Sequence, residues 1–353
     1  MSGLLEVVNG GLAVSIQDRG RPGHRAIGIP LSGALDPRLM AAANALADNP
    51  PDAAVLEIPL TGPGLKAVRG PVRVGLAGAL DARRIDGQGR SLAVAPWSSV
   101  TLFAGDTLLV GNVRQGIAYL AVSGGFQTEA TLGSRATYRR AGLGGVRGAL
   151  LATGQQLPCG LHGGNPWQEW RNPTPLAWAA GPIRLIPGPQ QAHFTPEALA
   201  ALVAEPFRVS SAADRMGMRL EGPTLGHNAL GADILSDGVT PGCIQVPANG
   251  QPIILLADCQ TTGGYPKIGT VISADLPRLG HARPGDLLRF TWVDMPQALA
   301  ARRESYQQFD TWLRGLQPYT PPGVIDEAAL YSANLAGCAI RGDDPHLSLE
   351  PTQ

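Results

Sequence analysis

The chain has 353 residues, of which 44% are hydrophobic and only 5% aromatic, enough apolar material for two domains of ordinary size with aliphatic cores. The formal net charge is +0, so the chain has no positive surplus with which to bind a nucleic-acid backbone. No apolar run approaches the roughly 20 residues that cross a membrane, and the N-terminal residues lack the positive and apolar regions of a signal peptide, so we expect no membrane partner.

The first half of the chain is predicted to consist mainly of short strands. Residues 4–8 and 13–16 are strand-like, and Asp36 followed by Pro37 is a typical helix start, because aspartate caps free amides and proline suits the first helical turn. Further apolar segments follow, many at a spacing of about eight to twelve residues: 54–58, 72–76, 100–103, 107–110 and 118–122. This rhythm, with 46 glycines and 31 prolines, indicates a β-barrel or a β-sandwich.

The second half repeats the pattern of the first. A strand at 183–186 precedes Thr195 and Pro196, which again combine a helix cap with a proline. A turn followed by a strand at 104–109 recurs in kind at 284–288, which favours two related β-barrels in tandem. The predicted domains are a first barrel at 1–160, a connector at 161–181, a second barrel at 182–294, and a C-terminal helix and tail at 295–353, loose from about Arg341.

A polar segment in the second half is the strongest candidate for a site that performs chemistry. Gln245, Asn249 and Gln251 offer neutral amides, which recognise an amide or ureido group without a charge penalty. Adjacent glycines at 263 and 264 let a ligand approach backbone N–H groups closely, as in an anion nest or an oxyanion hole.

The same segment contains the side chains with acid, base or cationic character. Asp258 and Gln260 follow an apolar strand, at the point where side chains emerge from the core. Tyr265 and Lys267, one of only two lysines in the chain, supply a proton donor and a cation for a carboxylate or phosphate. Polar residues beside glycine and proline are mostly turn formers, so each residue alone is better explained by structure. The cluster as a whole favours function, because so many convergent polar groups are costly with nothing to bind.

A second candidate lies in the glycine-rich stretch near the N-terminus. Arg21 and its neighbouring arginines can hold an anion beside Ser32. Equally, Asp18 can pair with an arginine and Asp36 can serve only as a helix cap. Arg215, further along the chain, suits either a ligand clamp or an internal salt bridge.

These considerations give two sets of candidate residues. The predicted catalytic residues are Asp258, Gln260, Thr261, Tyr265 and Lys267. The predicted substrate-binding residues are Arg21, Ser32, Arg215, Gln245, Asn249, Gln251, Thr262, Gly263 and Gly264.

Several kinds of site are not supported by the sequence. The six histidines share no metal-like spacing, so we expect no metal site. The glycine-rich segments do not sit between a strand and a helix as a dinucleotide site requires, and there is no GxxxxGK[ST] motif for ATP. The four cysteines are far apart without a CxxC pair, and we expect reduced thiols and a cytoplasmic location.

Six segments carry a family resemblance that covers most of the chain, from about residue 4 to 294. They are SIQDRGRPG, GIPLSGALD, AYLAVSGGF, GSRATY, DRMGMRLEG and QTTGGYPKI. Together they resemble the KipA family, which includes the C subunit of bacterial 5-oxoprolinase and the proteins called allophanate hydrolase subunit 2, within the biotin-dependent carboxyltransferases. The resemblance implies a mainly β fold with a few helices, in which two cyclophilin-like β-barrels stand in tandem.

The resemblance also implies a function within a multi-subunit complex. In that function the chain acts with two partners, a KipI-like subunit (the B subunit of 5-oxoprolinase) and a LamB/YcsF-like subunit (the A subunit). The complex uses ATP to open 5-oxoproline, a small cyclic amide, to glutamate. One alternative is a carboxyltransferase that moves a carboxyl group from carboxybiotin to urea or a related amide. The biotin would then be carried by another chain, because neither lysine lies beside a methionine. A second alternative is a non-catalytic regulatory partner of a KipI-like kinase inhibitor.

Overall fold

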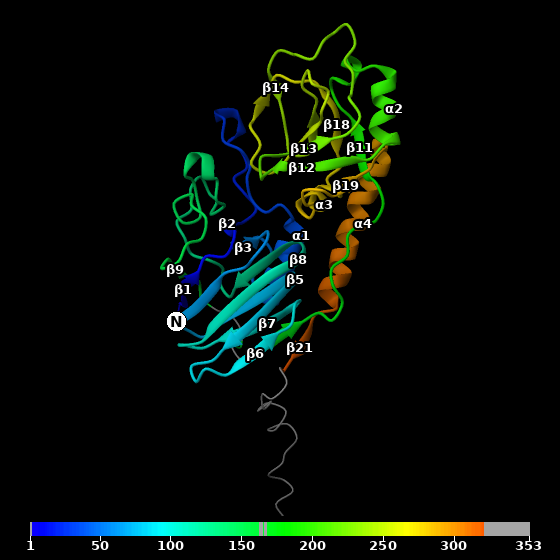
Figure 1. The fold of residues 1–353 in the computed structure, drawn as a ribbon. Coiled ribbons are helices and arrows are strands. Elements are labelled where there is room, and N and C mark those ends of the chain that lie inside the picture. Colours follow the sequence, from blue (N-terminus) through cyan, green and yellow to red (C-terminus); the bar gives the residue numbers. More distant parts are fainter. Residues whose placement is uncertain (1, 162–164, 166–167, 321–353) are drawn as a thin grey trace, which may run out of the picture.

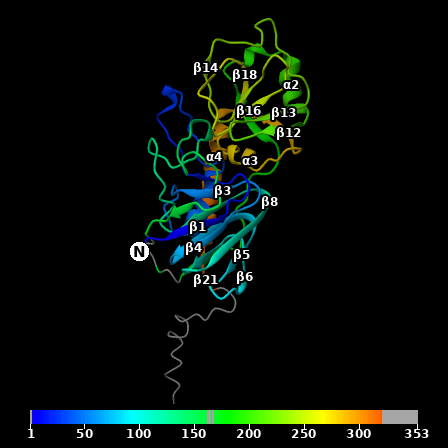
Figure 2. The same cartoon turned by 60° about the vertical axis from the view of Figure 1, so that its left-hand side comes forward.

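The computed structural model describes residues 2–161, 165 and 168–320. It contains a larger and a smaller β-sheet, one above the other in Figure 1, with a long helix alongside both. The larger sheet has 11 strands and the smaller has 8. Figure 2 shows the same division after a turn of 60°. The predicted mainly β fold in two halves is confirmed.

The larger sheet is built from the first half of the chain and a late strand. Its strands are β1 (Leu4–Asn9), β2 (Ser15–Gln17), β3 (Val55–Ile58), β4 (Gly64–Arg69), β5 (Val72–Ile85), β6 (Ser91–Val94), β7 (Ser98–Leu102), β8 (Thr107–Val122), β9 (Gln156–Pro158), β10 (Glu169–Arg171) and β21 (Gln317–Tyr319). The first half of the chain also contains the short 3₁₀ turns η1 (Arg25–Ile27) and η2 (Arg139–Ala141).

The two longest strands of this sheet, β5 and β8, pair along most of their length. The segments 107–110 and 118–122, predicted as separate strands, are the two ends of β8. Register shifts between Ala77 and Ala82 of β5 lie opposite the polar middle of β8 and let the pairing continue past it. Alternating aliphatic side chains of both strands then enter one core with those of β1, β3 and β4.

The helix α1 (Pro37–Leu46) covers this sheet on the side facing the junction of the two halves. Its start is the predicted one: the Asp36 side chain accepts hydrogen bonds from the N–H groups of Arg38 and Leu39, both at 3.0 Å. Its apolar face packs on β5 and β8, in a core that includes Leu39 and Tyr119.

The smaller sheet belongs to the second half of the chain. Its strands are β11 (Ile183–Pro187), β12 (Phe207–Ala213), β13 (Gly217–Glu221), β15 (Cys243–Gln245), β16 (Ile253–Leu255), β18 (Lys267–Val271), β19 (Leu287–Leu288) and β20 (Phe290–Trp292). A separate ribbon pairs β14 (Asp237–Gly238) with β17 (Thr262–Gly263). The predicted strand at 183–186 is β11, and η3 (Gln191–His193), α2 (Pro196–Ala204) and α3 (Leu276–Gly280) complete this half.

The turn that recurs in the two halves has the same hydrogen bonds in each. In the first half the Gly105 N–H donates to the Ala67 carbonyl, and the Ala67 N–H donates to the carbonyl of the aspartate after the glycine, both at 2.8 Å. Gly285 and Val209 repeat the pair of bonds at the same two distances. The glycines have φ of 96° and 95°, a backbone region that favours glycine. The echo in the sequence therefore marks an equivalent turn.

The chain passes between the halves through residues 161–181, predicted to be a connector. Within the described part of this segment, β10 pairs with β7 and with β21, so it extends the larger sheet. The predicted domain boundaries stay predictions. The predicted closing helix is α4 (Met295–Arg314), whose Trp312 ring packs edge-on against Trp97 at 5.8 Å. The tail predicted to be loose lies outside the described residues.

Candidate functional site

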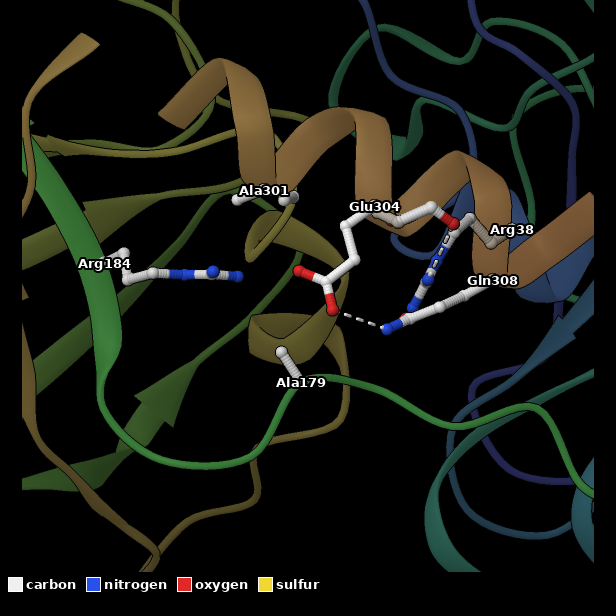
Figure 3. A pocket seen from close by; sticks show the side chains of 8 residues that line it. Arg38, Ala179, Arg184, Ala301, Glu304 and Gln308 are labelled. Atoms are coloured by element: carbon white, nitrogen blue, oxygen red, sulfur yellow. Dashed lines mark hydrogen bonds between the residues drawn. The ribbon is translucent and has the colours of Figure 1, made fainter. Parts of the chain in front are cut away.

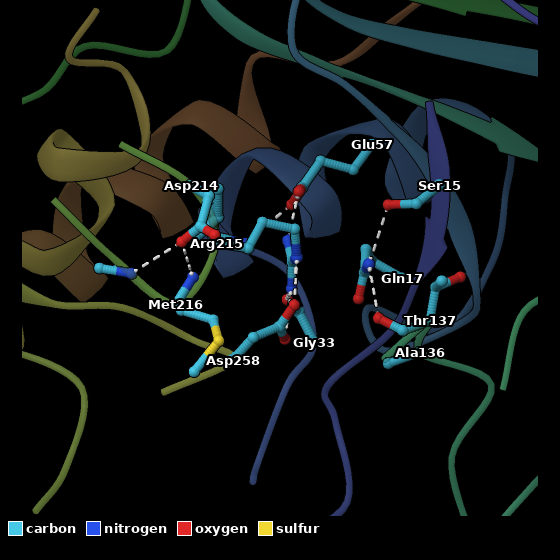
Figure 4. Close-up of polar contacts among 12 residues, drawn as sticks. Ser15, Gln17, Gly33, Glu57, Ala136, Thr137, Asp214, Arg215, Met216 and Asp258 are labelled. Carbon is cyan, nitrogen blue, oxygen red and sulfur yellow. Dashed lines mark hydrogen bonds and ion pairs between the residues drawn. The ribbon is translucent and has the colours of Figure 1, made fainter. Parts of the chain in front are cut away.

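Arg215, in the turn between β12 and β13, joins the two halves of the molecule. Its guanidinium forms ion pairs with Glu57 of β3 in the first half and with Asp258 of the second half, the latter at 2.9 Å from Nε. Figure 4 shows it between the two carboxylates and the carbonyl of Gly33. Burial alone would lower the pKa of Arg215, but the two carboxylates raise it above its ordinary value. Of the two interpretations left open by the sequence, a ligand clamp or an internal salt bridge, the structure shows the salt bridge. We call Arg215, Glu57 and Asp258 together the Arg215 clamp, because they hold the two halves of the molecule together.

The Arg215 clamp continues into the first half through a buried tyrosine. The Tyr119 hydroxyl donates to Glu57 at 2.6 Å and accepts from the Asp36 N–H at 3.0 Å. Burial and the charge of Glu57 raise the pKa of Tyr119 well above its ordinary value. The tyrosine therefore stays a neutral donor that orients the carboxylate.

Asp36 connects this chain of hydrogen bonds to the second half again. Besides capping α1, its carboxylate accepts from Trp178 Nε1 at 2.7 Å and lies 2.9 Å from His281 Nε2. Burial raises the pKa of this carboxyl, but the bonds from His281 and from the helix amides outweigh it and lower the pKa overall. The interpretation of Asp36 as a helix cap alone is therefore too narrow.

Four buried side chains beside the Arg215 clamp hold polar atoms that have no hydrogen-bond partner among the described residues. These atoms are Gln17 Oε1, Arg21 Nε and Nη1, Ser32 Oγ and Thr137 Oγ1. The four residues are between 0% and 3% exposed. We call them the buried polar cluster. Leaving such groups buried without partners costs roughly 1–3 kcal/mol each, and more for a charged one, so the cluster is unusual for a purely structural region.

The buried polar cluster is held together by backbone contacts. Gln17 Nε2 donates to the Thr137 carbonyl at 3.3 Å, and Arg21 Nη2 donates to the carbonyl of the preceding residue, Ala136. Ser32 has a φ of 54° and its N–H donates at 3.0 Å to Ala257, next to Asp258 of the Arg215 clamp. In Figure 4, Gln17 and Thr137 lie across from the clamp. The structure thus brings the predicted residues Arg21 and Ser32 to the junction of the two halves.

Loop 19–33 carries both of these residues. At its base the N–H of Ala34 donates to the Asp18 carbonyl at 2.9 Å, and Gly33, with a φ of 87°, packs so closely that a Cβ would lie 2.7 Å from the Gly20 nitrogen. At its tip, Arg25 donates to the Val239 carbonyl of the second half. Figures 1 and 2 show this dark-blue loop reaching toward β14.

The predicted cation Lys267 is buried and already has an anionic partner. It is 1% exposed, and its Nζ lies 2.8 Å from Asp237 Oδ2, which also accepts from Gln190 at 3.1 Å. The hydrogen bond from Lys267 lowers the pKa of Asp237 below its ordinary value. The lysine charge is therefore neutralised by Asp237 within the protein. Of the two partners, only the half-exposed carboxylate faces solvent.

Gln245 lies beside this ion pair and is 2% exposed. Its Oε1 accepts from Gln260 at 3.3 Å, whereas its Nε2 has no partner within the part of the chain that the structure describes. A Cβ on Gly263 would lie 2.4 Å from that Nε2, so a larger residue there would displace the Gln245 amide. Gly263 pairs with Asp237 as part of a β-ribbon, and neither it nor Gly264 has a positive φ, so the expected anion nest is not formed by a left-handed turn.

The remaining predicted residues are in the β15–β16 turn or at the surface. Asn249 accepts from the Gln251 N–H, and the Gln251 side chain bonds to the backbone of Gly222, so these amides are engaged in the turn. Thr262 and Tyr265 are exposed and Thr261 is half-buried. No side-chain contact among the described residues assigns these three a role.

Sequence reasoning missed several members of the site. Glu57 is a charge inside the apolar segment 54–58, which is a signal that a buried partner exists. Gln17 and Thr137 carry no comparable signal, because their role depends on the folded loop around Arg21. Asp237 was also missed, since only the pairing of β14 with β17 brings it beside Lys267.

The small cavity, the buried thiols and the titratable side chains elsewhere in the described residues do not suggest a second binding or catalytic site. The cavity in Figure 3, between Arg38, Arg184 and Glu304, has a volume of about 10 Å³, room for about one water molecule. Burial raises the pKa of Cys259 to about 11, so its thiol is not a ready nucleophile. Residues 2–161, 165 and 168–320 hold no group of three side chains that suits a metal ion. No helix in that part of the chain is long and apolar enough to span a membrane.

Comparisons with known proteins agree on one family. The family model described as "Carboxyltransferase domain, subdomain A and B" matches residues 27–292. The chain is 35% identical to the C subunit of 5-oxoprolinase from Escherichia coli K12, over 87% of this chain and 97% of that protein. It is 32% identical to "Putative urea carboxylase" of Emericella nidulans, over 85% of this chain but 25% of that protein.

Solved structures show the same fold. The crystal structure of TTHA0988 matches with a TM-score of 0.71 and 35% identity over 82% of this chain. The present chain spans only 56% of that longer chain. The structure of the K. lactis urea amidolyase matches with a TM-score of 0.77 over 92% of this chain and 20% of that one; at 24% identity this likeness concerns the fold alone.

Proposed function

Since the chain belongs to the family of carboxyltransferase domains with subdomains A and B, we propose that it is the C subunit of an ATP-dependent 5-oxoprolinase complex. The observation that carries this proposal is the 35% identity to the corresponding E. coli protein, which extends over 97% of that relative. A match along nearly the whole relative supports a similar role in a similar complex, whereas the urea carboxylase is matched over only a quarter of its length.

In this proposal the complex opens the lactam ring of 5-oxoproline to glutamate, and its other members are a KipI-like protein and a LamB/YcsF-like protein. ATP is used by the complex as a whole, and this sequence has no GxxxxGK[ST] motif with which to bind it in a P-loop. The chain's own contribution is to bind and orient the cyclic amide.

The geometry that supports such binding lies along residues 257–260. The Ala257 carbonyl accepts from the Ser32 N–H of the buried polar cluster, and Gln260 bonds to Gln245, so this short segment connects the cluster with Gln245. The buried polar cluster and Gln245 both hold buried polar atoms without partners among the described residues, and such atoms suit an amide substrate. The predicted catalytic residues Asp258, Gln260, Thr261, Tyr265 and Lys267 remain the first candidates for mutation.

The test is glutamate release from 5-oxoproline and ATP, measured with this chain alone, with the two partners alone, and with all three together. We expect activity only in the full mixture. Equal activity without this chain would refute the proposal.

A second candidate function is carboxyl transfer to urea or a related amide. It is supported by the family description and by the 32% identity to the Emericella nidulans protein. Neither lysine of this chain suits a biotin carrier: Lys267 is 1% exposed, and Lys66, although exposed on β4, has no neighbouring methionine. A carrier on another chain would therefore have to deliver carboxybiotin. Transfer of label from bicarbonate to urea with a separate carrier and carboxylase would favour this function.

Tight binding to a KipI-like partner without either activity would favour a regulatory role.

A further inference from the structure

We propose that Arg21, together with Ser32 and Thr137, binds the carboxylate of the substrate while Gln17 accepts from its lactam N–H, so that this chain selects cyclic amides that carry an acid group. This inference rests on the proposed function, because it names the part of 5-oxoproline that the junction of the two halves recognises. Recognition of the carboxylate would distinguish 5-oxoproline from urea, which has no carboxylate.

The guanidinium of Arg21 is arranged to receive an anion. The residue is 0% exposed, and its one hydrogen-bond acceptor among the described residues is the carbonyl of Ala136, which binds Nη2. Arginine has five N–H donors, two of them on Nη2. Whichever Nη2 hydrogen this carbonyl takes, one complete edge of the guanidinium stays available, and a carboxylate accepts two parallel N–H bonds from such an edge.

The nearby carboxylates are engaged elsewhere. Asp18 accepts from the Gly20 N–H at 2.7 Å, from Ser134 Oγ at 2.6 Å and from a neighbouring amide, and Asp258 is paired with Arg215. Both act on Arg21 through their charge without forming an ion pair with it. Burial of the guanidinium opposes its positive charge and lowers the pKa of Arg21. The buried guanidinium lacks hydration by water, and an incoming carboxylate would stabilise its positive charge instead.

The other members of the buried polar cluster offer groups that are chemically complementary to such a substrate. The Gln17 side chain is oriented without ambiguity, because its Nε2 donates to the Thr137 carbonyl, which can only accept. Its Oε1 is therefore an acceptor, and it suits the N–H of a lactam ring. The hydroxyls of Ser32 and Thr137 can donate to carboxylate oxygens.

Loop 19–33 contributes two residues to the cluster and contacts the second half of the chain at its tip. Arg21 and Ser32 lie on its inner side, while its tip at residues 26–28 is exposed and contacts the second half through Arg25. Because Arg21 is 0% exposed, binding of substrate to it requires a movement of the surrounding chain.

The first test is steady-state kinetics of the full complex with 5-oxoproline. For Arg21→Gln we expect KM to rise about tenfold to a hundredfold with a smaller change in kcat, because a charged hydrogen bond to a non-reacting group is lost. Arg21→Lys should recover part of this loss. The matched control is Arg19→Gln, which removes the same charge two residues away from a side chain that is 67% exposed, and should leave KM unchanged. An unaltered KM in a folded Arg21→Gln variant would overturn the inference while the proposed function stands.

The second test measures binding to the full chain alone, as the shift of its melting temperature. We expect sodium 5-oxoproline to stabilise wild type, and 2-pyrrolidinone, the same lactam without its carboxylate, to do so far less. The preference should disappear in Arg21→Gln and weaken in Ser32→Ala, which loses only one hydroxyl. Equal stabilisation by both lactams, or by bicarbonate to the same degree as by 5-oxoproline, would contradict the inference. A preference that depends on Arg21 in a chain whose complex shows no oxoprolinase activity would support the inference and refute the proposed function.

Discussion

Arg215 lies between two carboxylates that belong to different halves of the molecule. The Glu57 and Asp258 side chains are only 4% and 8% exposed. Taking such charges out of water is unfavourable, and their interaction with Arg215 offsets this cost only while all three groups are present. The residue is therefore a structural link across the junction as well as a neighbour of the buried polar cluster.

Replacing Arg215 by glutamine should lower the free energy of unfolding by about 3–5 kcal/mol, because two buried carboxylates lose their cation. Urea denaturation of the full chain measures this change. The matched control is Arg114→Gln, which breaks an ion pair whose partners are 66% and 53% exposed, and no measurable change is expected there. Similar decreases in the free energy of unfolding in both variants would show that the Arg215 clamp stabilises the fold no more than an exposed ion pair does.

The ion pair between Lys267 and Asp237 is asymmetric, since the lysine is buried and the carboxylate is 51% exposed. Lys267→Met leaves a carboxylate that water can solvate, whereas Asp237→Asn leaves a buried ammonium without its anion. We expect Asp237→Asn to be the more destabilising of the two in urea denaturation. The opposite order would mean that Lys267 is solvated in the folded chain.

Individual residues show where sequence reasoning succeeds and where it stops. Lys267 is a candidate because lysine is rare in a chain with twenty-six arginines. Its partner Asp237 lies 30 residues away, on the β14–β17 ribbon, which no local sequence pattern predicts. Arg21 and Ser32 were candidates because of residue type alone. Their unpartnered atoms depend on how loop 19–33 folds, which the sequence does not specify locally.

At the scale of elements, helix α1 shows how a local signal acquires a second role. Asp36 caps the helix as predicted, and the same carboxylate binds His281 and Trp178 of later segments. The cap follows from two adjacent residues, but contacts across more than a hundred residues do not. The long strand β8 is a similar case, because its polar middle resembles a loop until it is paired with β5.

The lowered pKa of Asp36 makes a prediction about acid stability. A carboxyl whose pKa is lower in the folded state stabilises the fold above its unfolded pKa of about 3.9, and this contribution is lost as the pH falls through the folded value. Asp36→Asn keeps a good helix cap but removes the charge. The variant should be less stable than wild type at pH 7, and the difference should shrink below about pH 4.

Denaturation at a series of pH values from neutral to acid checks this expectation. A stability difference between wild type and Asp36→Asn that stays constant across the series would mean that the charge of Asp36 contributes nothing.

At the scale of the whole molecule, two related β units meet at a polar junction. The recurring turn at Gly105 and Gly285 has the same hydrogen bonds in both units, so the tandem arrangement could be predicted from a short echo in the sequence. The junction could not, because Glu57, Arg215 and Asp258 come together only when the halves pack. The long helix α4 runs beside both units and packs against the larger sheet through Trp312.

Hydrogen–deuterium exchange of the complex with and without 5-oxoproline tests whether substrate binds at this junction. We predict slower exchange, on adding substrate, in loop 19–33, at residues 135–137 and at residues 257–260, which belong to both halves. Protection confined to one half, or to segments away from the junction, would contradict binding at the junction.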